Sequence, residues 1–203
     1  MSVEAVDGLV LKGTLSYPGN YAGVAFPLVV LAHQYPATRD SYAPLVADLL
    51  ESGVATLAFD ERGHGSSIQG SRGPLLIDTP GGLDAEAFGT AFVSSIAKVG
   101  FARIDNDILR VTGWGGAQDF IDPARVALVG SSVGGSGVLL AAQKIPNLPA
   151  VATIGAAGAS AFGPDTSARI RSIVEQLKLR YSLHHPVKTH STAVPTCLRG
   201  AVT

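Results

Sequence analysis

The stretch VALVGSSVGGSGVLLAAQK, residues 126–144, decides how the rest of the chain is interpreted. It opens with a short apolar run, residues 126–129, that is typical of a buried strand. After a turn it continues as Gly-, Ala- and Leu-rich sequence of helical length. The turn is Gly-Ser-Ser-Val-Gly, and Ser132 is its central residue. A serine at the tip of so tight a turn adopts a strained backbone conformation, which costs about 1–3 kcal/mol. Glycines on either side remove side chains that would clash there.

The pattern G-x-S-x-G between a strand and a helix is the nucleophile elbow, which projects a serine hydroxyl from the end of a sheet. This pattern makes Ser132 a candidate nucleophile. The alternative is an ordinary turn serine, because glycine and serine are common in this chain. The segments upstream of the elbow, described below, favour the first interpretation.

Composition limits the class of protein. The chain has 203 residues, of which 46% are hydrophobic and 15% charged, enough apolar sequence for one globular domain with a sizeable core. The net charge is −1, so we expect no nucleic-acid partner, and no run is apolar and long enough to span a membrane. The single cysteine, Cys197, excludes an internal disulfide framework, and the N-terminus lacks the apolar segment of a secretory signal. We therefore expect a cytoplasmic protein.

Strand and helix patterns alternate along the first 160 residues. Residues 3–6 and 9–17 alternate apolar and polar side chains, which predicts an antiparallel hairpin. Apolar runs predict strands over residues 27–32, 55–59, 126–129 and 150–156, and periodic apolar patterns predict helices over residues 42–51, 83–100 and 104–121, the last interrupted by glycines. We expect Asp40 or Ser41 to cap the first helix and residues 70–82 to form a loop. Strand–helix–strand order predicts an α/β fold whose mostly parallel sheet has helices on both faces.

Four segments carry a resemblance to a known family. They are PLVVLAHQYP (residues 27–36), VATLAFDERGHGSS (54–67), DPARVALVGSSVGG (122–135) and PAVATIGAAG (149–158). In this order and spacing the chain resembles an α/β-hydrolase, and within that superfamily it is similar to small members of the dienelactone-hydrolase and acyl-esterase type. The resemblance covers roughly residues 3–160. It implies one α/β-hydrolase domain over residues 1–203, with residues 163–192 as a lid or helical excursion.

The resemblance also assigns roles around the elbow. Ser132 would be the nucleophile, and the backbone N–H of Val133 would be one oxyanion donor at the start of the helix. The second donor would be the backbone N–H of Tyr35, or less favourably that of Gln34. Gln34 stands where the family usually has glycine, which leaves the path of this loop open. The reaction implied is hydrolysis of a carboxylic ester or related acyl bond in a small molecule, and no cofactor is implied.

Other residues with reactive side chains have simpler interpretations. In the family, the histidine corresponding to His33 shapes the oxyanion loop and does not carry the proton. His64 and Asp60 belong to a turn that the family uses structurally. Cys197 lies in an apolar run and is most simply a core residue. The spacing of His184, His185, His190 and Cys197 matches no closed zinc pattern, and the glycines after Ser132 match no nucleotide-binding loop, so no metal or nucleotide is expected.

The acid and the histidine of a triad must follow the serine in this fold. Residues 194–198 resemble the next-to-last strand, after which the acid normally lies. The resemblance therefore places the acid at or beyond Thr203, and it implies that the last strand, the histidine loop and the closing helix are missing. A second arrangement preserves the order Ser, acid, His within the chain. It uses Asp165 as the acid and His184, His185 or His190 as the base.

Two functional hypotheses follow from the sequence. The first is a serine hydrolase that works through an acyl-enzyme. The second is a truncated or frame-shifted hydrolase fragment that is non-catalytic and acts at most as a binding module. Residues 168–183 carry apolar side chains at helical spacing and predict an amphipathic helix that packs on the sheet or forms a lid. The histidines near this helix would then precede the last strand, which weakens the second triad arrangement.

Overall fold

The computed structural model describes residues 1–19, 23, 25–77, 82–156, 168 and 170–176. Its strands are β1 (Ser2–Glu4), β2 (Val10–Ser16), β3 (Phe26–Ala32), β4 (Ala55–Phe59), β5 (Gln69–Gly70), β6 (Gly73–Pro74), β7 (Ile121–Ser131) and β8 (Ala150–Ile154). Its α-helices are α1 (Ala43–Glu51), α2 (Ala85–Lys98), α3 (Ile104–Gly116) and α4 (Val133–Ala142). Two short 3-10 helices, Arg39–Tyr42 and Phe101–Arg103, lead into α1 and α3. Residues 170–176 are also helical.

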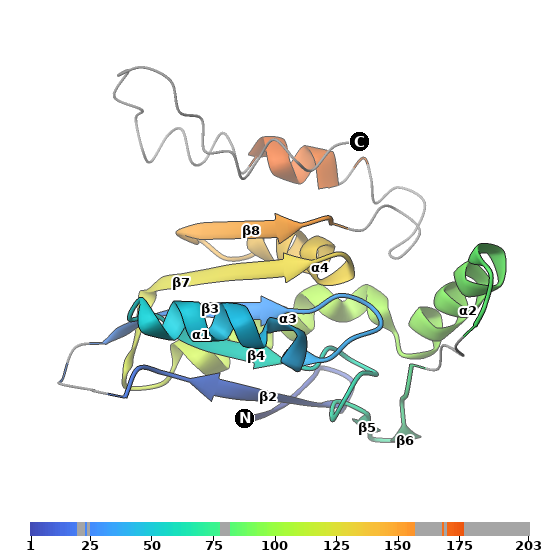
Figure 1. Cartoon of the computed structure of the whole chain (residues 1–203), viewed down its shortest axis with the longest axis horizontal. Coiled ribbons are helices and arrows are strands. Elements are labelled where there is room, and N and C mark those ends of the chain that lie inside the picture. The colour runs from blue at the N-terminus through green and yellow to red at the C-terminus, as the bar shows by residue number, and fades with distance from the viewer. Residues whose placement is uncertain (20–22, 24, 78–81, 157–167, 169, 177–203) are drawn as a thin grey trace.

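One sheet of eight strands, counted over the described residues, forms the centre of the molecule (Figure 1). The strand order is β6-β5-β2-β4-β3-β7-β8, and β1 pairs with β2. Strands β4, β3, β7 and β8 are mutually parallel, whereas β2 runs antiparallel to β4. The parallel strands therefore end at a common edge of the sheet. In open α/β sheets this carboxyl edge is where ligands bind.

Helices cover both faces of the sheet. Helix α1 lies in front of it in Figure 1, and α3 and α4 lie behind. All residues of α4 are buried. A Cβ added to Gly137 of α4 would come within 2.9 Å of Ile108 and 3.2 Å of Ile104 in α3, so small residues let these two helices pack closely. Because both faces are covered, β4 is buried along its whole length, as its continuous apolar sequence predicts.

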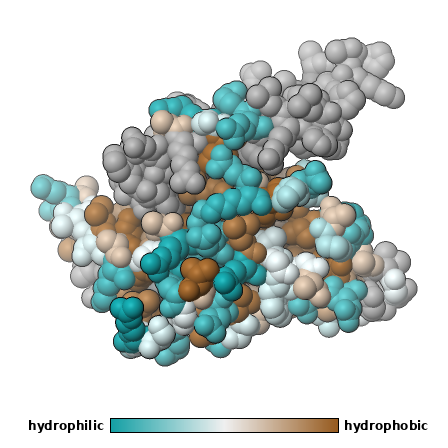
Figure 2. Space-filling view, turned by 180° about the vertical axis from the view of Figure 1, so that it is seen from behind, coloured by the Kyte–Doolittle hydropathy of each residue, from teal (hydrophilic) through white to brown (hydrophobic). Residues whose placement is uncertain are grey.

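The helical residues 170–176 extend this packing beyond β8. Ile173 is fully buried and forms a small apolar cluster with Leu139 and Leu140 of α4, against which Ile170 and Val174 also pack. This part of the predicted amphipathic helix therefore packs on the domain. In the described part of the chain, no helix combines the length and the hydropathy that a bilayer crossing needs. Seen from behind, the surface is a mosaic of hydrophilic and hydrophobic residues (Figure 2).

Most of the predicted elements are confirmed. The N-terminal hairpin forms with Val3 opposite Leu11. The strand predicted over residues 55–59 coincides with β4, and the strand predicted over residues 27–32 is β3 with one residue added at its start. The α/β class and the sheet with helices on both faces are likewise confirmed.

The predicted cap of α1 is wrong. Neither Asp40 nor Ser41 caps this helix, because both lie in the 3-10 turn before it, and the N-cap residue Tyr42 makes no side-chain capping bond. That turn is anchored from outside instead. The backbone N–H of Arg39 donates to Asp60 Oδ1 at 2.9 Å, and the Arg39 guanidinium contacts the same carboxylate.

Two further expectations are corrected by the structure. Residues 70–82 are not all loop, because β5 and β6 pair with each other and Gln69 pairs with Val10 of β2. The glycines of α3 do not interrupt it. A Cβ at Gly115 would come within 2.7 Å of Leu28 and 2.9 Å of Leu57, so glycine there lets the helix lie close against the sheet. Helix α3 ends at Gly116, and β7 begins at Ile121, which pairs with Phe26 of β3.

Candidate active site

Ser132 lies between the last residue of β7 and the first residue of α4. Its φ of 49° and ψ of −115° fall in a region that residues with a Cβ rarely occupy. Among the described non-glycine residues, only Asn147 also has a positive φ. The Ser132 N–H donates to the carbonyl of Ile154 in β8 at 2.9 Å, and its own carbonyl accepts from the N–H of Ser136 at 3.1 Å. The residue is half-buried, so the turn tip reaches the surface.

Two glycines make this turn sterically possible. A Cβ at Gly130 would collide with the backbone of Gly134, across the turn. A Cβ at Gly134 would collide with the carbonyl oxygens of Ala32 and His33. The turn therefore lies directly against the end of β3. The G-x-S-x-G spacing is thus explained by two backbone contacts that exclude any larger residue.

The loop that follows β3 is tied to the turn by side chains. The hydroxyl of Ser131 donates to Gln34 Oε1 at 2.8 Å. Gln34 stands where the family usually has glycine, and its amide group holds the loop beside the residue that precedes Ser132. The path of this loop, which the sequence left open, is therefore fixed by a bond that glycine could not make.

His33 is held by the main chain at both ring nitrogens. Its Nδ1 lies 2.8 Å from the carbonyl oxygen of Gln34, and its Nε2 accepts from the N–H of Glu61 at 3.0 Å. A carbonyl can only accept, so Nδ1 carries the proton. The ring is fully buried, and burial lowers the pKa of His33 below its usual value. These contacts agree with a loop-shaping role for His33.

Aromatic side chains line the outer side of the same loop. The ring of Tyr35 meets that of Phe92 in α2 edge-to-face, with centroids 4.7 Å apart, and lies 6.1 Å from Phe88. The rings of Phe88 and Phe92 are nearly parallel at 6.4 Å. Phe88 is 39% exposed. Helix α2 therefore brings an apolar, partly open wall to the residue whose N–H is an oxyanion-donor candidate.

The turn after β4 is built around the carboxylate of Asp60. This group accepts from the N–H of Ser66 at 2.8 Å and binds Arg39. A Cβ at Gly65 would collide with the carboxylate, so the second glycine of the D-x-R-G-x-G pattern leaves room for it. The structural role that the resemblance assigns to Asp60 agrees with these contacts.

Arg62 of the same turn is the largest fully buried side chain among the described residues. It binds both carboxylate oxygens of Asp107, at 2.6 and 2.9 Å, and donates to the carbonyl of Val99 at 2.8 Å and to Asp7 at 3.1 Å. Burial opposes ionisation of Asp7, but hydrogen bonds from Arg62 and Arg103 prevail and lower the pKa of Asp7 to about 2. The network thus joins the first hairpin, the turn after β4, and the region between α2 and α3.

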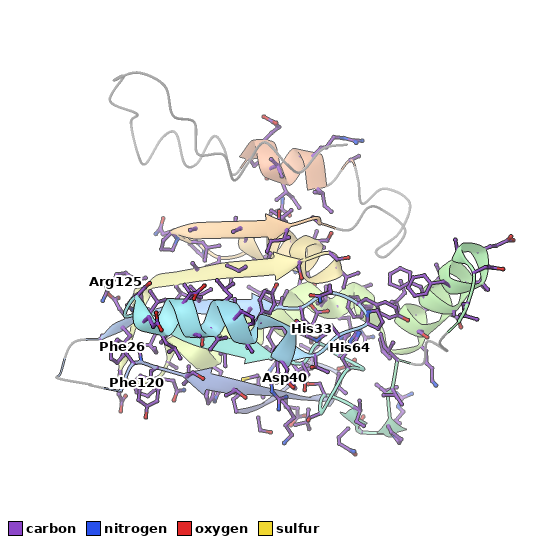
Figure 3. The ribbon with its side chains drawn as sticks, in the orientation of Figure 1. Phe26, His33, Asp40, His64, Phe120 and Arg125 are labelled. Carbon is purple, nitrogen blue, oxygen red and sulfur yellow. The ribbon has the colours of Figure 1, made fainter. Side chains whose placement is uncertain are left out.

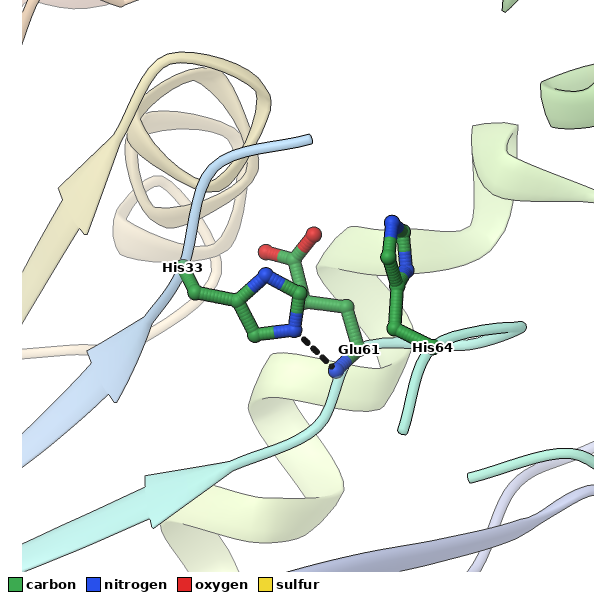
Figure 4. A group of neighbouring side chains, drawn as sticks. All are labelled: His33, Glu61 and His64. Atoms are coloured by element: carbon green, nitrogen blue, oxygen red, sulfur yellow. Dashed lines mark hydrogen bonds between the residues drawn. The ribbon is translucent and has the colours of Figure 1, made fainter. Parts of the chain in front are cut away.

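Glu61 and His64 flank Arg62 and are both buried, with relative exposures of 0% and 5%. Burial, with a contribution from Asp107, raises the pKa of the Glu61 carboxyl well above its usual value. Burial, with a contribution from His33, lowers the pKa of His64 to about 4. Figure 4 shows the Glu61 carboxyl beside the His33 ring, with the His64 side chain, from the same turn as Glu61, on the opposite side. Burial therefore disfavours the charged form of all three groups, the Glu61 carboxyl and the two imidazoles.

The structure brings several of the sequence-predicted residues to one edge of the sheet. His33 and His64 lie at the carboxyl ends of β3 and β4, whereas Phe26, Phe120 and Arg125 lie at the opposite end (Figure 3). Ser132, Val133, Gln34 and Tyr35 belong to the same carboxyl edge, by their positions after β7 and β3. The remaining candidates lie outside the described residues. They are Asp165, His184, His185, His190 and Cys197.

Comparison with known proteins decides the family. The sequence profile of the α/β hydrolase fold matches residues 27–184, which include both loops and the turn at Ser132. The chain belongs to the α/β hydrolase fold family. The resemblance inferred from the four sequence segments is thereby confirmed.

Two sequence relatives of this hydrolase-fold chain come from Escherichia coli. Both are described as an uncharacterized 31.7 kDa protein in the traX–finO intergenic region. They are 32% identical over 122 residues and 31% identical over 119 residues. The alignments cover 60% and 58% of this chain but 34% and 33% of the relatives, so the chain spans about a third of the length of the curated relatives it matches.

Solved structures show the same fold. The DcsB complex with its substrate analogue has a TM-score of 0.57 at 14% identity, covering 95% of this hydrolase-fold chain and 54% of DcsB. Est1E from Butyrivibrio proteoclasticus, with ferulic acid bound, has a TM-score of 0.54 at 25% identity, covering 74% of this chain and 50% of Est1E. Acetyl xylan esterase from Paenibacillus sp. R4 has a TM-score of 0.55 at 24% identity, covering 74% of this chain and 46% of the esterase.

Three features of the site were not foreseen from sequence. They are the hydrogen bond from the Ser131 hydroxyl to Gln34, the aromatic wall from α2, and the buried carboxyl of Glu61. The pattern at Phe88 and Phe92 predicted a helix, but nothing in it indicates which loop the helix faces. Asp60 and Glu61 come immediately after the apolar strand β4, and two consecutive charged residues at that point were the signal that could have marked Glu61.

Proposed function

We propose that this chain is a serine hydrolase that cleaves a carboxylic ester or related acyl bond through an acyl-enzyme, with Ser132 as the nucleophile. The observation that carries the proposal is the positive φ of Ser132 at the carboxyl edge of a parallel sheet, directly against the loop after β3. Acetyl xylan esterase, an esterase by name, and Est1E, which binds ferulic acid, share this fold and support the reaction class.

In the proposed reaction, Ser132 Oγ attacks the ester carbonyl while its proton passes to a histidine base. The resulting oxyanion accepts hydrogen bonds from the backbone N–H groups of Val133 and Tyr35, each contributing about 3–4 kcal/mol to the transition state. The alcohol leaves with a proton returned by the base, and water then hydrolyses the acyl-enzyme. This chemistry needs no cofactor.

The base and its acid partner are the open part of the proposal. Of the two described histidines, His33 has both ring nitrogens bonded to the main chain, so it is poorly suited to accept the serine proton. The candidates for base are His184, His185 and His190, with Asp165 as the candidate acid. All four lie outside the described residues.

The wall formed by Tyr35, Phe88 and Phe92 favours an apolar acyl group. These rings flank the loop that would bind the oxyanion, and Phe88 is partly exposed beside it. Aromatic walls bind apolar and planar groups through large contact areas. We propose an aromatic or medium-chain acyl ester as the substrate class.

The test is covalent labelling with a fluorophosphonate probe, followed by peptide mapping. We expect one label per chain on Ser132, and none in the Ser132→Ala variant. The matched control is Ser131→Ala, which removes the neighbouring hydroxyl and its bond to Gln34 but keeps the proposed nucleophile, so labelling should remain on Ser132.

Turnover is measured in parallel with p-nitrophenyl esters of different acyl chains. Hydrolysis above that of Ser132→Ala supports the full proposal. If the folded wild-type chain is not labelled, or if the label falls on another residue, Ser132 is not an activated nucleophile. The hypothesis of a non-catalytic hydrolase-fold binding module would then replace the enzymatic one.

A further inference from the structure

One buried cluster plays no part in the proposed reaction. It consists of His33 at the end of β3 and of Glu61 and His64 in the turn after β4, and one potential metal-ligand atom from each lies within 4.8 Å of the other two. All three residues are buried, with relative exposures of 0%, 0% and 5%. They come from two loops that are far apart in sequence and meet at the carboxyl edge of the sheet (Figure 4).

The cluster contains polar atoms that the described part of the protein leaves without hydrogen-bond partners. These atoms are both carboxyl oxygens of Glu61 and Nε2 of His64, each buried away from solvent. Burying such atoms unpaired is unfavourable, and a buried carboxylate is especially costly without a cation. The other carboxyl groups of this region are satisfied: Asp60 binds Arg39, and Asp107 binds Arg62.

The adjacent Arg62 cannot supply the missing positive charge. Its guanidinium nitrogens are all used by Asp107, Asp7 and the carbonyl of Val99. His64 is oriented by its other nitrogen, because Nδ1 lies 3.2 Å from the carbonyl of Arg62. A carbonyl can only accept, so Nδ1 carries the proton and Nε2 presents a lone pair. Metal-binding histidines are oriented in this way, by a backbone carbonyl on the nitrogen that does not bind the metal.

We propose that His33, Glu61 and His64 form a binding site for a divalent transition metal of the Zn²⁺ type. Glu61 supplies a carboxylate oxygen and His64 supplies Nε2. His33 is the third ligand. Its Nε2 would give up the hydrogen bond from the Glu61 N–H and bind the metal instead. Two imidazoles and one carboxylate suit Zn²⁺, whereas Ca²⁺ and Mg²⁺ prefer oxygen ligands throughout.

A metal at this position would join the loops after β3 and β4. His33 precedes Gln34, which binds Ser131 beside the Ser132 turn. The metal would therefore fix the loop that carries Tyr35 without touching the substrate. The site does not depend on the proposed esterase activity, and its test does not measure that activity.

The full chain is first freed of metal with a chelator. It is then titrated with Zn²⁺ in competition with a chromophoric chelator, which reports the affinity. A second titration uses Co²⁺ and is followed by absorption spectroscopy. We expect one metal per chain, a tetrahedral-type Co²⁺ spectrum, and a raised melting temperature with Zn²⁺. Glu61→Gln should weaken Zn²⁺ binding by more than about tenfold and lose the thermal shift.

Two controls separate this site from adventitious binding. In the first, His184, His185 and His190 are replaced together by Gln, and Zn²⁺ affinity should be retained. In the second, the exposed Glu51→Gln variant should bind as the wild type does. The melting temperature of Glu61→Gln without metal shows whether that variant is folded, and His64→Gln serves as a second ligand variant. Equal Zn²⁺ affinity in the wild type and both ligand variants, or loss of binding in the triple histidine variant, overturns the proposal.

Discussion

At the scale of single residues, the Ser132 turn depends on two positions, Gly130 and Gly134, that carry no side chain. The Ser132 turn leaves no space for a Cβ at Gly130 or Gly134, because backbone atoms already occupy it. Flexible side chains can move to relieve such a clash, but backbone held in a sheet and a helix cannot. The turn is therefore intolerant of even one added carbon at either glycine.

We predict that Gly134→Ala lowers the free energy of unfolding by about 1–3 kcal/mol, because the added methyl group meets the carbonyls of Ala32 and His33. Urea unfolding followed by circular dichroism measures the change. Gly89→Ala in α2 is the matched control. It has open space around it, and it should stabilise the protein by about 0.5–1 kcal/mol through helix propensity. Equal stabilities for the two variants would contradict the packing argument.

At this scale the sequence predicted features that depend on neighbouring residues in the chain, and it did not predict contacts between residues far apart in sequence. The glycines around Ser132 are a local backbone requirement, so the pattern revealed them. The hydrogen bond from Ser131 to Gln34 joins residues 97 positions apart, and no property of Gln34 itself indicates its partner. The same holds for Glu61, whose burial follows from the packing of two loops.

At the scale of elements, α2 lies beside the loop after β3, where Phe92 packs on Tyr35. It extends away from the sheet in Figure 1, and its Asp84 N-cap accepts from the N–H of Ala87 at 2.8 Å. Leu83, Phe88 and Val93 are all more than a third exposed, whereas Phe92 packs on Tyr35. One side of α2 therefore supports the loop after β3, while apolar side chains remain open beside it.

We predict that Phe92→Ala lowers kcat/KM for p-nitrophenyl esters by about tenfold or more, because Tyr35 loses the ring that holds its loop. Steady-state kinetics measures this change, and it assumes the proposed esterase activity. Val93→Ala, on the exposed side of the same helix, is the control and should keep wild-type kinetics. If Phe92→Ala lowers the melting temperature but leaves kcat/KM unchanged, Phe92 contributes to stability alone.

Elements with strong periodicity were predictable, and their ends were less so. Strands β3 and β4 followed from continuous apolar runs, and α2 followed from its apolar spacing. The cap of α1 was predicted wrongly because residues 39–42 form a 3-10 turn in which Arg39 binds Asp60, a contact that no local signal encodes. The helix predicted over residues 104–121 was too long and the strand predicted over residues 126–129 too short, because α3 ends at Gly116 and β7 begins at Ile121, where it pairs with Phe26 of β3.

At the scale of the whole molecule, one buried arginine connects elements from three parts of the chain. Arg62 holds Asp7 of the first hairpin, the carbonyl of Val99 after α2, and Asp107 of α3. Asp7 also binds the half-exposed Arg103 at 2.6 Å. The N-terminal hairpin is therefore attached to the domain partly through charge.

We predict that this attachment makes stability fall in acid. Asp7 has a pKa of about 2 in the folded protein against an ordinary value of 3.8. The contribution of Asp7 to the free energy of unfolding is complete when the pH lies above its ordinary pKa of 3.8, and it is lost as pH falls from about 4 to about 2. The size is about 1–2 kcal/mol after allowing for solvent screening. Urea unfolding across this pH range measures it. Asp7→Asn should be less stable than the wild type at neutral pH and should show a shallower acid slope; an unchanged slope would exclude Asp7 as its source.

The backbone amide of Ser132 is bound to Ile154, the last residue of β8. The turn's costly dihedral angles are therefore maintained in part by a strand that follows it in the chain, after helix α4. A polypeptide emerging during synthesis could not lock this geometry until β8 had docked, so the reactive hydroxyl would be assembled late. Protection of that single amide against deuterium would then report the moment at which the turn acquires its final shape.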